Sequence, residues 1–215
     1  MNRNGLISAT FAIALFACVL LPGDGSAQTE GATSWTWAAA LSAAVVVNDA
    51  NWSVSHPIYS GGGVTWETFR GTVSQRTHFQ GSVELRRGFL AIRGSVGMLP
   101  QTFTHDAPAV ENDLNLLLAG LAVVLYPAAG SARRLEPYVA VGAGAQKATG
   151  DMDNGGFYLS GATGLRIGVG SHFAVDAGVQ VYRLNYTQIE LTSTIAKDVR
   201  TYPVMAVVGF FLNGG

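Results

Sequence analysis

The chain has 215 residues, of which 13 are Lys or Arg and 14 are Asp or Glu, so its charged fraction of 13% is about half that of an ordinary soluble domain. A net charge of −1 excludes the basic face of a nucleic-acid-binding protein, and a mean hydropathy of +0.27 points towards lipid. The chain has 27 glycines but only 7 prolines, which fits neither collagen nor Pro-rich disorder. The glycines are therefore expected inside ordered structure.

Residues 1–27 have the pattern of a cleavable secretory signal peptide. A positively charged start precedes the apolar run Leu6–Leu21, and Gly25–Ala27 offers small residues before the expected cleavage site. A lipobox at Leu15–Cys18 is the alternative processing site. Cleavage after Ala27 would leave one domain, residues 28–215, without cysteine and therefore without a disulfide framework.

After the signal peptide no apolar run is long enough for a spanning helix, because Asn48 and Asp49 interrupt the longest candidate, Trp37–Val47. A closed β-barrel is the other architecture that satisfies every backbone group in lipid. Its strands are about ten residues long and alternate apolar with polar or small side chains. Eight segments fit, although Leu114–Tyr126 is apolar on both faces and its register stays open. In chain order they are Trp35–Val47, His78–Arg86, Leu90–Met98, Leu114–Tyr126, Tyr138–Gln146, Phe157–Val169, Phe173–Tyr182 and Tyr202–Leu212.

The connections between these segments alternate in length, as in an up-and-down barrel. An even strand number would leave both termini in the periplasm, and the aromatic residues at the segment ends predict girdles at the lipid–water interfaces. The short turns lie near Arg87–Gly88, Pro127–Glu136 and Gly170–His172. The longer, polar connections are expected to be external loops: Asp49–Gln75, Leu99–Asp113, Lys147–Gly156 and Thr187–Val199.

The segment Glu136–Ala145, EPYVAVGAGA, resembles the PYxGxGxG strand of small OmpA-like and OmpX-like outer-membrane β-barrel proteins, and Pro203–Leu212 is similar to their last strand. The resemblance implies an all-β, eight-stranded antiparallel up-and-down transmembrane β-barrel. It also implies that the outer-membrane assembly machinery reads an aromatic residue near the C-terminus, here Phe210 or Phe211, although this chain continues to Leu212–Gly215. No peptidoglycan-binding domain is expected after the barrel.

Motifs for catalysis or for cofactor and metal binding are sparse. The four histidines lack metal-ligand spacing and are expected to be solvated, in loops or at strand ends: His56, His78, His105 and His172. Ser53 and Ser55 lie near His56 without an acidic partner, so a polar loop is preferred over a lipid-modifying enzyme. We expect the protein to have no enzymatic activity and to bind no cofactor and no metal.

One further segment, Asp151–Gly156, is similar to the start of a calcium loop. Its twelfth position is Ala162, where calcium needs a glutamate. A hairpin tip at Asn154–Gly155 is the preferred interpretation.

Four charged residues fall on the polar faces of the predicted strands: Glu84, Arg93, Arg166 and Asp176. A three-residue loop at Gly170–His172 would place Arg166 directly opposite Asp176. Glu84 and Arg93 would form a diagonal pair if the turn is Arg87–Gly88, and a direct pair if it is Gly88–Phe89. They could line an ionic gate, but paired charges that fill a narrow barrel are the preferred interpretation.

The expected function is that of a monomeric, non-enzymatic outer-membrane protein that supports the envelope and displays loops for adhesion. Its expected partners are outer-membrane lipid, lipopolysaccharide and the assembly machinery, with no nucleic acid. The alternative is a narrow passive channel for small or hydrophobic solutes. A third possibility, a soluble periplasmic carrier, would have its apolar faces pointing inward.

Overall fold

The computed structural model describes residues 35–60, 63–75, 77–106, 109–127, 135–150, 154–170, 172–191 and 194–214. The predicted signal peptide and the Leu15–Cys18 motif lie outside these ranges. The described residues contain no apolar helix of bilayer-spanning length. Their strands are β1 (Thr36–Val46), β2 (Ala50–Ser60), β3 (Gly63–Gln75), β4 (Thr77–Arg87), β5 (Leu90–Asp106), β6 (Ala109–Leu125), β7 (Leu135–Gly150), β8 (Asn154–Gly168), β9 (Phe173–Leu191), β10 (Thr194–Thr201) and β11 (Val204–Gly214).

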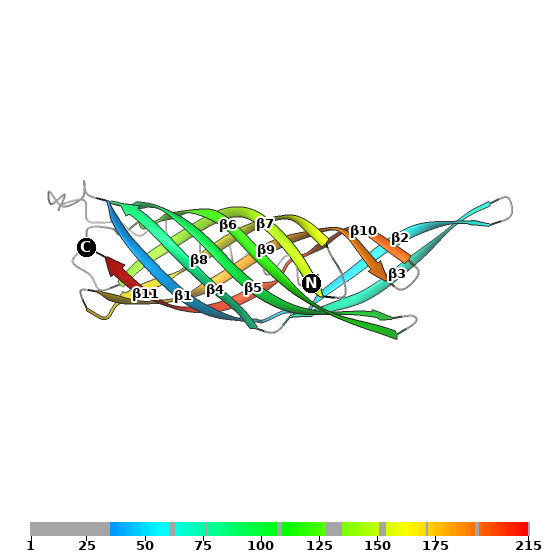
Figure 1. The fold of residues 1–215 in the computed structure, drawn as a ribbon, viewed down its shortest axis with the longest axis horizontal. Helices are drawn as coiled ribbons and strands as arrows, with labels where there is room; N and C mark the ends of the chain where they lie inside the picture. The colour runs from blue at the N-terminus through cyan, green and yellow to red at the C-terminus, as the bar shows by residue number, and fades with distance from the viewer. Residues whose placement is uncertain are drawn as a thin grey trace, which may run out of the picture.

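Antiparallel pairing closes eight of these strands into a barrel. Their order around it is β4-β1-β11-β9-β8-β7-β6-β5, and the pairing of β5 with β4 completes the ring. Figure 1 shows the strands tilted and wound about a common axis. The predicted up-and-down barrel is confirmed.

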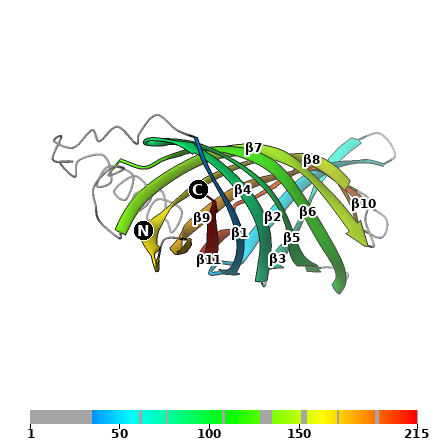
Figure 2. The ribbon, with the colours of Figure 1, turned by 60° about the vertical axis from the view of Figure 1, so that its left-hand side comes forward.

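The two ends of the barrel differ. At one end, which we call the turn end, a two-residue turn joins Arg87 to Leu90, and Gly88 adopts a φ of 60° at its first central position. The C-terminus also lies there (Figure 1). At the other end, which we call the hairpin end, β2 pairs with β3 and β10 pairs with β9, and the β2–β3 hairpin projects well beyond the barrel (Figures 1 and 2).

The prediction of long loops was wrong for the hairpin end. Most of Asp49–Gln75 forms the β2–β3 hairpin, and the other three predicted loops are largely extensions of β5 to β10. Asn154 and Gly155 are not a hairpin tip, because they pair with Ala148 and Lys147 as the last two pairs of the β7–β8 ladder. The sequence misled here because the apolar alternation stops where lipid would end, whereas backbone pairing continues beyond it.

Alternation along the strands separates an outer from an inner face. On β6, whose register was open, Leu114, Leu116 and Leu118 are buried in the lumen, whereas Leu117 and Leu121 are exposed outside. Every other barrel strand shows the alternation expected from its sequence, with the aliphatic face outward.

The glycines of the lumen face make room for two tyrosine rings. Tyr158 on β8 lies over Gly144, its register partner, and over Gly120 on the next strand; a Cβ on Gly144 would come within 2.6 Å of the ring. Tyr138 on β7 reaches the opposite way, so that a Cβ on Gly164 or on the next strand's Gly178 would lie 2.9 or 3.1 Å from its hydroxyl. Two aromatic rings thus occupy the space of four absent side chains, which accounts for part of the glycine excess.

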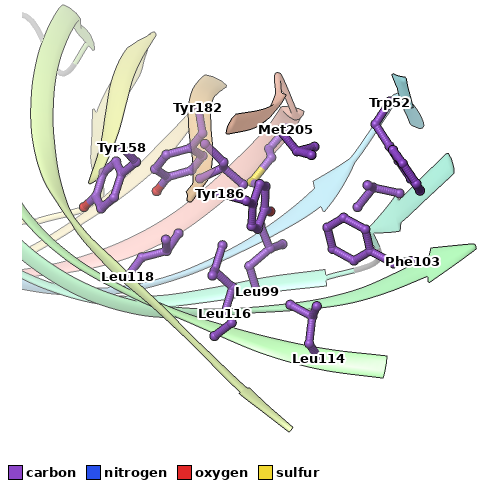
Figure 3. Packing of buried hydrophobic residues seen from close by; sticks show 14 of the residues in the cluster. Trp52, Leu99, Phe103, Leu114, Leu116, Leu118, Tyr158, Tyr182, Tyr186 and Met205 are labelled. Carbon is purple, nitrogen blue, oxygen red and sulfur yellow. The ribbon is translucent and has the colours of Figure 1, made fainter. Parts of the chain in front are cut away.

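At the hairpin end the lumen is a packed apolar core. Phe103 meets Tyr186 edge-on with ring centroids 5.4 Å apart. The Tyr186 hydroxyl donates a hydrogen bond to Gln101 Oε1 at 2.6 Å, and burial raises the pKa of this phenol. Figure 3 shows the side chains converging from opposite walls. They include Trp52, Leu99, Leu114, Leu116, Leu118, Tyr158, Tyr182 and Met205. Leu184 belongs to the same buried cluster.

Candidate functional site

The four charged residues singled out in the sequence meet in one network in the lumen near the turn end. Arg166 lies opposite Asp176 in the β8–β9 ladder, and its Nε donates to Asp176 Oδ1 at 3.0 Å. Glu84 lies directly opposite Arg93, which donates to Glu84 Oε2 at 2.7 Å. The direct pair is the arrangement expected for a Gly88–Phe89 turn.

The two pairs are joined across the barrel. Arg166 Nη1 donates to Glu84 Oε1 at 2.9 Å, and Arg93 Nη2 lies 3.8 Å from Asp176 Oδ2. Two carboxylates and two guanidiniums therefore form a ring of zero net charge. Glu84 is only 1% exposed, a position that a carboxylate occupies when paired and hydrogen-bonded.

Aromatic side chains enclose this network. The Tyr126 hydroxyl donates to Glu84 Oε1 at 2.8 Å, and the Arg166 guanidinium carbon lies 3.9 Å from the centroid of the Phe211 ring. The guanidinium of Arg93 lies 5.4 Å from the Tyr138 ring centroid. The guanidinium groups are attracted to the faces of these aromatic rings, and each carboxylate accepts hydrogen bonds from charged donors.

A second ion pair, not predicted from the sequence, lies beside the network. Arg86 donates both Nη groups to Glu136, at 2.7 and 2.9 Å, and its guanidinium carbon lies 4.1 Å from the Tyr126 ring centroid. The alternation of side chains along the strands could have predicted that both residues face the lumen. Glu136 is two residues before the inward-facing Tyr138, and Arg86 is two residues after the inward-facing Glu84.

Between the ionic network and the apolar core lies a small polar cavity of about 50 Å³. This volume would hold a few water molecules. Tyr138 and Phe211 line it on the turn side, and Tyr158 and Tyr182 line it on the hairpin side. Its hydroxyl and amide groups come from Ser42, Gln80, Ser82, Ser95, Ser160 and Gln180.

The expectation of solvated histidines was wrong for His78. This residue is 1% exposed in the lumen, where its ring meets Tyr182 edge-on at 5.6 Å. His172 is exposed, whereas the side chains of His56 and His105 lie outside the described part of the structure. Among the described residues, no group of three or more His, Cys, Asp or Glu is placed to hold a metal ion.

Ser53 and Ser55, considered for catalysis, lie exposed on β2, and the Ser55 hydroxyl is 3.1 Å from that of Thr68. That contact fits a cross-strand pair of hydroxyls on the projecting hairpin.

The two candidate assembly residues face opposite ways. Phe210 is 68% exposed on the outer face of β11, whereas Phe211 is 4% exposed and packs against Arg166 in the lumen. Only Phe210 is therefore accessible from outside the folded barrel.

An apolar belt surrounds the barrel. Outward residues are apolar along each strand and become polar towards the hairpin end, as on β9, where Val179 and Val181 precede Arg183 and Asn185. Exposed aromatic residues mark both margins of the belt, with Phe173 and Phe210 near the turn end and Phe79, Phe157 and Tyr202 near the hairpin end. An outward apolar band with aromatic margins is typical of barrels in lipid, and it is the reverse of the inward-facing arrangement of a soluble carrier.

The chain matches no protein-family model and no curated protein. Solved structures do match it. The crystal structure of Neisserial surface protein A is similar over 83% of this chain and 98% of that chain, with 16% identity and a TM-score of 0.50. The outer membrane protein OprG from Pseudomonas aeruginosa is similar over 85% of this chain and 96% of its own, with 12% identity and a TM-score of 0.57. The chain thus has the eight-stranded fold of small outer-membrane β-barrel proteins.

Proposed function

We propose that this protein is a monomeric integral outer-membrane barrel that presents hairpins at the cell surface and has no catalytic activity. The observation that carries the proposal is the apolar outer belt, which combines exposed aliphatic side chains with a packed interior. A water-soluble protein would expose this surface at a large cost, whereas outer-membrane lipid and lipopolysaccharide would cover it.

In this proposal the turn end and both termini face the periplasm, and the hairpin end faces outward. The longer connections of outer-membrane barrels lie on the external side. The projecting hairpin supports a display role, because Val64 and Trp66 are 52% and 68% exposed on it, beyond the apolar belt. Large apolar side chains in such a position suit contact with a partner surface.

Fractionation and gel mobility test the membrane assignment. The mature protein should be recovered with outer membranes, and unheated samples in detergent gels should migrate differently from heated ones. Release by osmotic shock together with identical mobility would contradict the proposal.

Deletion of hairpin residues 55–68 tests the display role. Cells that carry this variant should lose adhesion to surfaces that wild-type cells bind, while the barrel still shows heat-dependent mobility. Unchanged adhesion would rule out a display role for this hairpin.

A further inference from the structure

Two arginines lie side by side on the outer wall, at the margin of the apolar belt. Arg200 is the register partner of Asn185 in the β9–β10 ladder. The same register continues into the pairing of β9 with β11, which places Tyr202 opposite Arg183. The four side chains form a two-by-two patch in which the arginines are diagonal neighbours, about 7–8 Å apart between backbone positions.

At this patch the outward-facing side chains of the strands change from apolar to polar. Below it on β9 the outward residues are Val181 and Val179, and below it on β11 they are Val204, Ala206 and Val208. A side chain at the patch therefore sits at headgroup depth if the belt sits in hydrocarbon, and the exposed Tyr202 ring is typical of that interface.

Neither arginine is paired with an acidic side chain in the described part of the structure. Among the described residues, no hydrogen bond or ion pair reaches the guanidinium of Arg183 or that of Arg200, and Arg183 Nε is both inaccessible to solvent and without an acceptor. Asp49, at the neighbouring end of β1, forms no ion pair with either arginine within the described ranges. Two like charges on diagonal positions repel each other, so an anion between them would be favoured by both.

We propose that Arg183 and Arg200 together bind a phosphate group of the outer-leaflet glycolipid, with Tyr202 packed at the headgroup boundary. Paired guanidiniums match phosphate oxygens in charge and in donor geometry. The site rests on the proposed membrane orientation and goes beyond it, because it assigns one patch of the barrel circumference to a specific lipid contact.

The test uses the refolded mature barrel in detergent micelles, with bound lipid A counted by native mass spectrometry. Wild-type protein should retain bisphosphorylated lipid A, and the Arg183→Gln/Arg200→Gln variant should bind it about tenfold or more weakly, since each charged hydrogen bond contributes at least that factor. Arg70→Gln is the control for the loss of an arginine elsewhere: it removes one positive charge at an exposed position on the projecting hairpin and should bind like wild type.

Two comparisons identify the ligand chemistry. Dephosphorylated lipid A should bind wild type as weakly as bisphosphorylated lipid A binds the double variant, and inorganic phosphate at equal concentration should not compete. Equal binding of the two lipids, equal binding by the double variant, or full competition by inorganic phosphate would each overturn the site. If wild type also lacks heat-dependent mobility and outer-membrane recovery, the proposed function fails; if those persist, only the lipid site fails.

Discussion

Arg166 and Glu84 meet across the full width of the lumen: they come from β8 and β4, which are four strands apart in either direction around the barrel, and lie 2.9 Å apart. Arg166 also holds Asp176, so one guanidinium connects both carboxylates of the network. This connection makes the four charges unequal in their effect on stability.

Arg166→Met should therefore destabilise the barrel more than Asp176→Asn. Loss of Arg166 leaves Asp176 with only Arg93 at 3.8 Å, whereas loss of Asp176 leaves Arg166 bound to Glu84. Breaking a buried pair from one side costs about 3–5 kcal/mol, and Arg166→Met/Asp176→Leu should recover much of that loss. Urea unfolding in lipid vesicles measures the difference; equal losses for both single variants would mean that the cross-lumen contact contributes little.

The glycines under the tyrosine rings give a second prediction. In Gly144→Ala the new methyl group would press on the Ala119 carbonyl oxygen and lie 2.6 Å from the Tyr158 ring, and the strain should cost about 1–3 kcal/mol. The control is Gly81→Ala, where the nearest atom is Leu41 Cδ2 at 3.8 Å and no loss is expected. Adding Tyr158→Leu to Gly144→Ala should restore part of the stability, and absence of rescue would show that the backbone, not the ring, rejects the methyl group.

Much of this arrangement could be predicted from the sequence because a barrel obeys simple local rules. Alternation identified the lumen face, and loop length fixed the Arg166–Asp176 register. The Glu84–Arg166 contact could not be predicted, because it depends on strand tilt and barrel closure, which no single hairpin contains. His78 was misplaced because the wall was predicted to begin there, whereas β3, which pairs with β5 over Gly71–Gln75, continues the wall beyond it.

Depth in the membrane should govern the cost of a charge on the outer face. Val141→Arg, in the middle of the belt, should cost roughly 2–4 kcal/mol, whereas Asn115→Arg, at the polar margin, should cost about 0–1 kcal/mol. Both positions are exposed and face outward, so the comparison isolates depth. A reversed order in vesicle unfolding would place the belt elsewhere.

The opposite orientations of Phe210 and Phe211 separate assembly from stability. Phe210→Ala should lower recovery of the barrel in the outer membrane while changing its unfolding free energy in vitro little, because its side chain lies outside the lumen. Phe211→Ala should do the reverse, since it removes the ring against Arg166. If Phe211→Ala alone impairs assembly without loss of stability, the assembly machinery reads the inward residue.

The lumen contains two barriers in series, and conductance can tell them apart. The ionic network closes the turn side of the polar cavity, and the apolar core closes the hairpin side. Wild-type protein in planar bilayers should show no steady conductance, and Arg166→Ala/Asp176→Ala should stay silent because the apolar core remains. Adding Tyr182→Gly and Met205→Gly to that variant should open small ion-permeable events, provided that heat-dependent mobility shows a folded barrel. Regular channels in the wild type would favour the passive-conduit alternative, and events in the ionic variant alone would show that the apolar core is no barrier to ions.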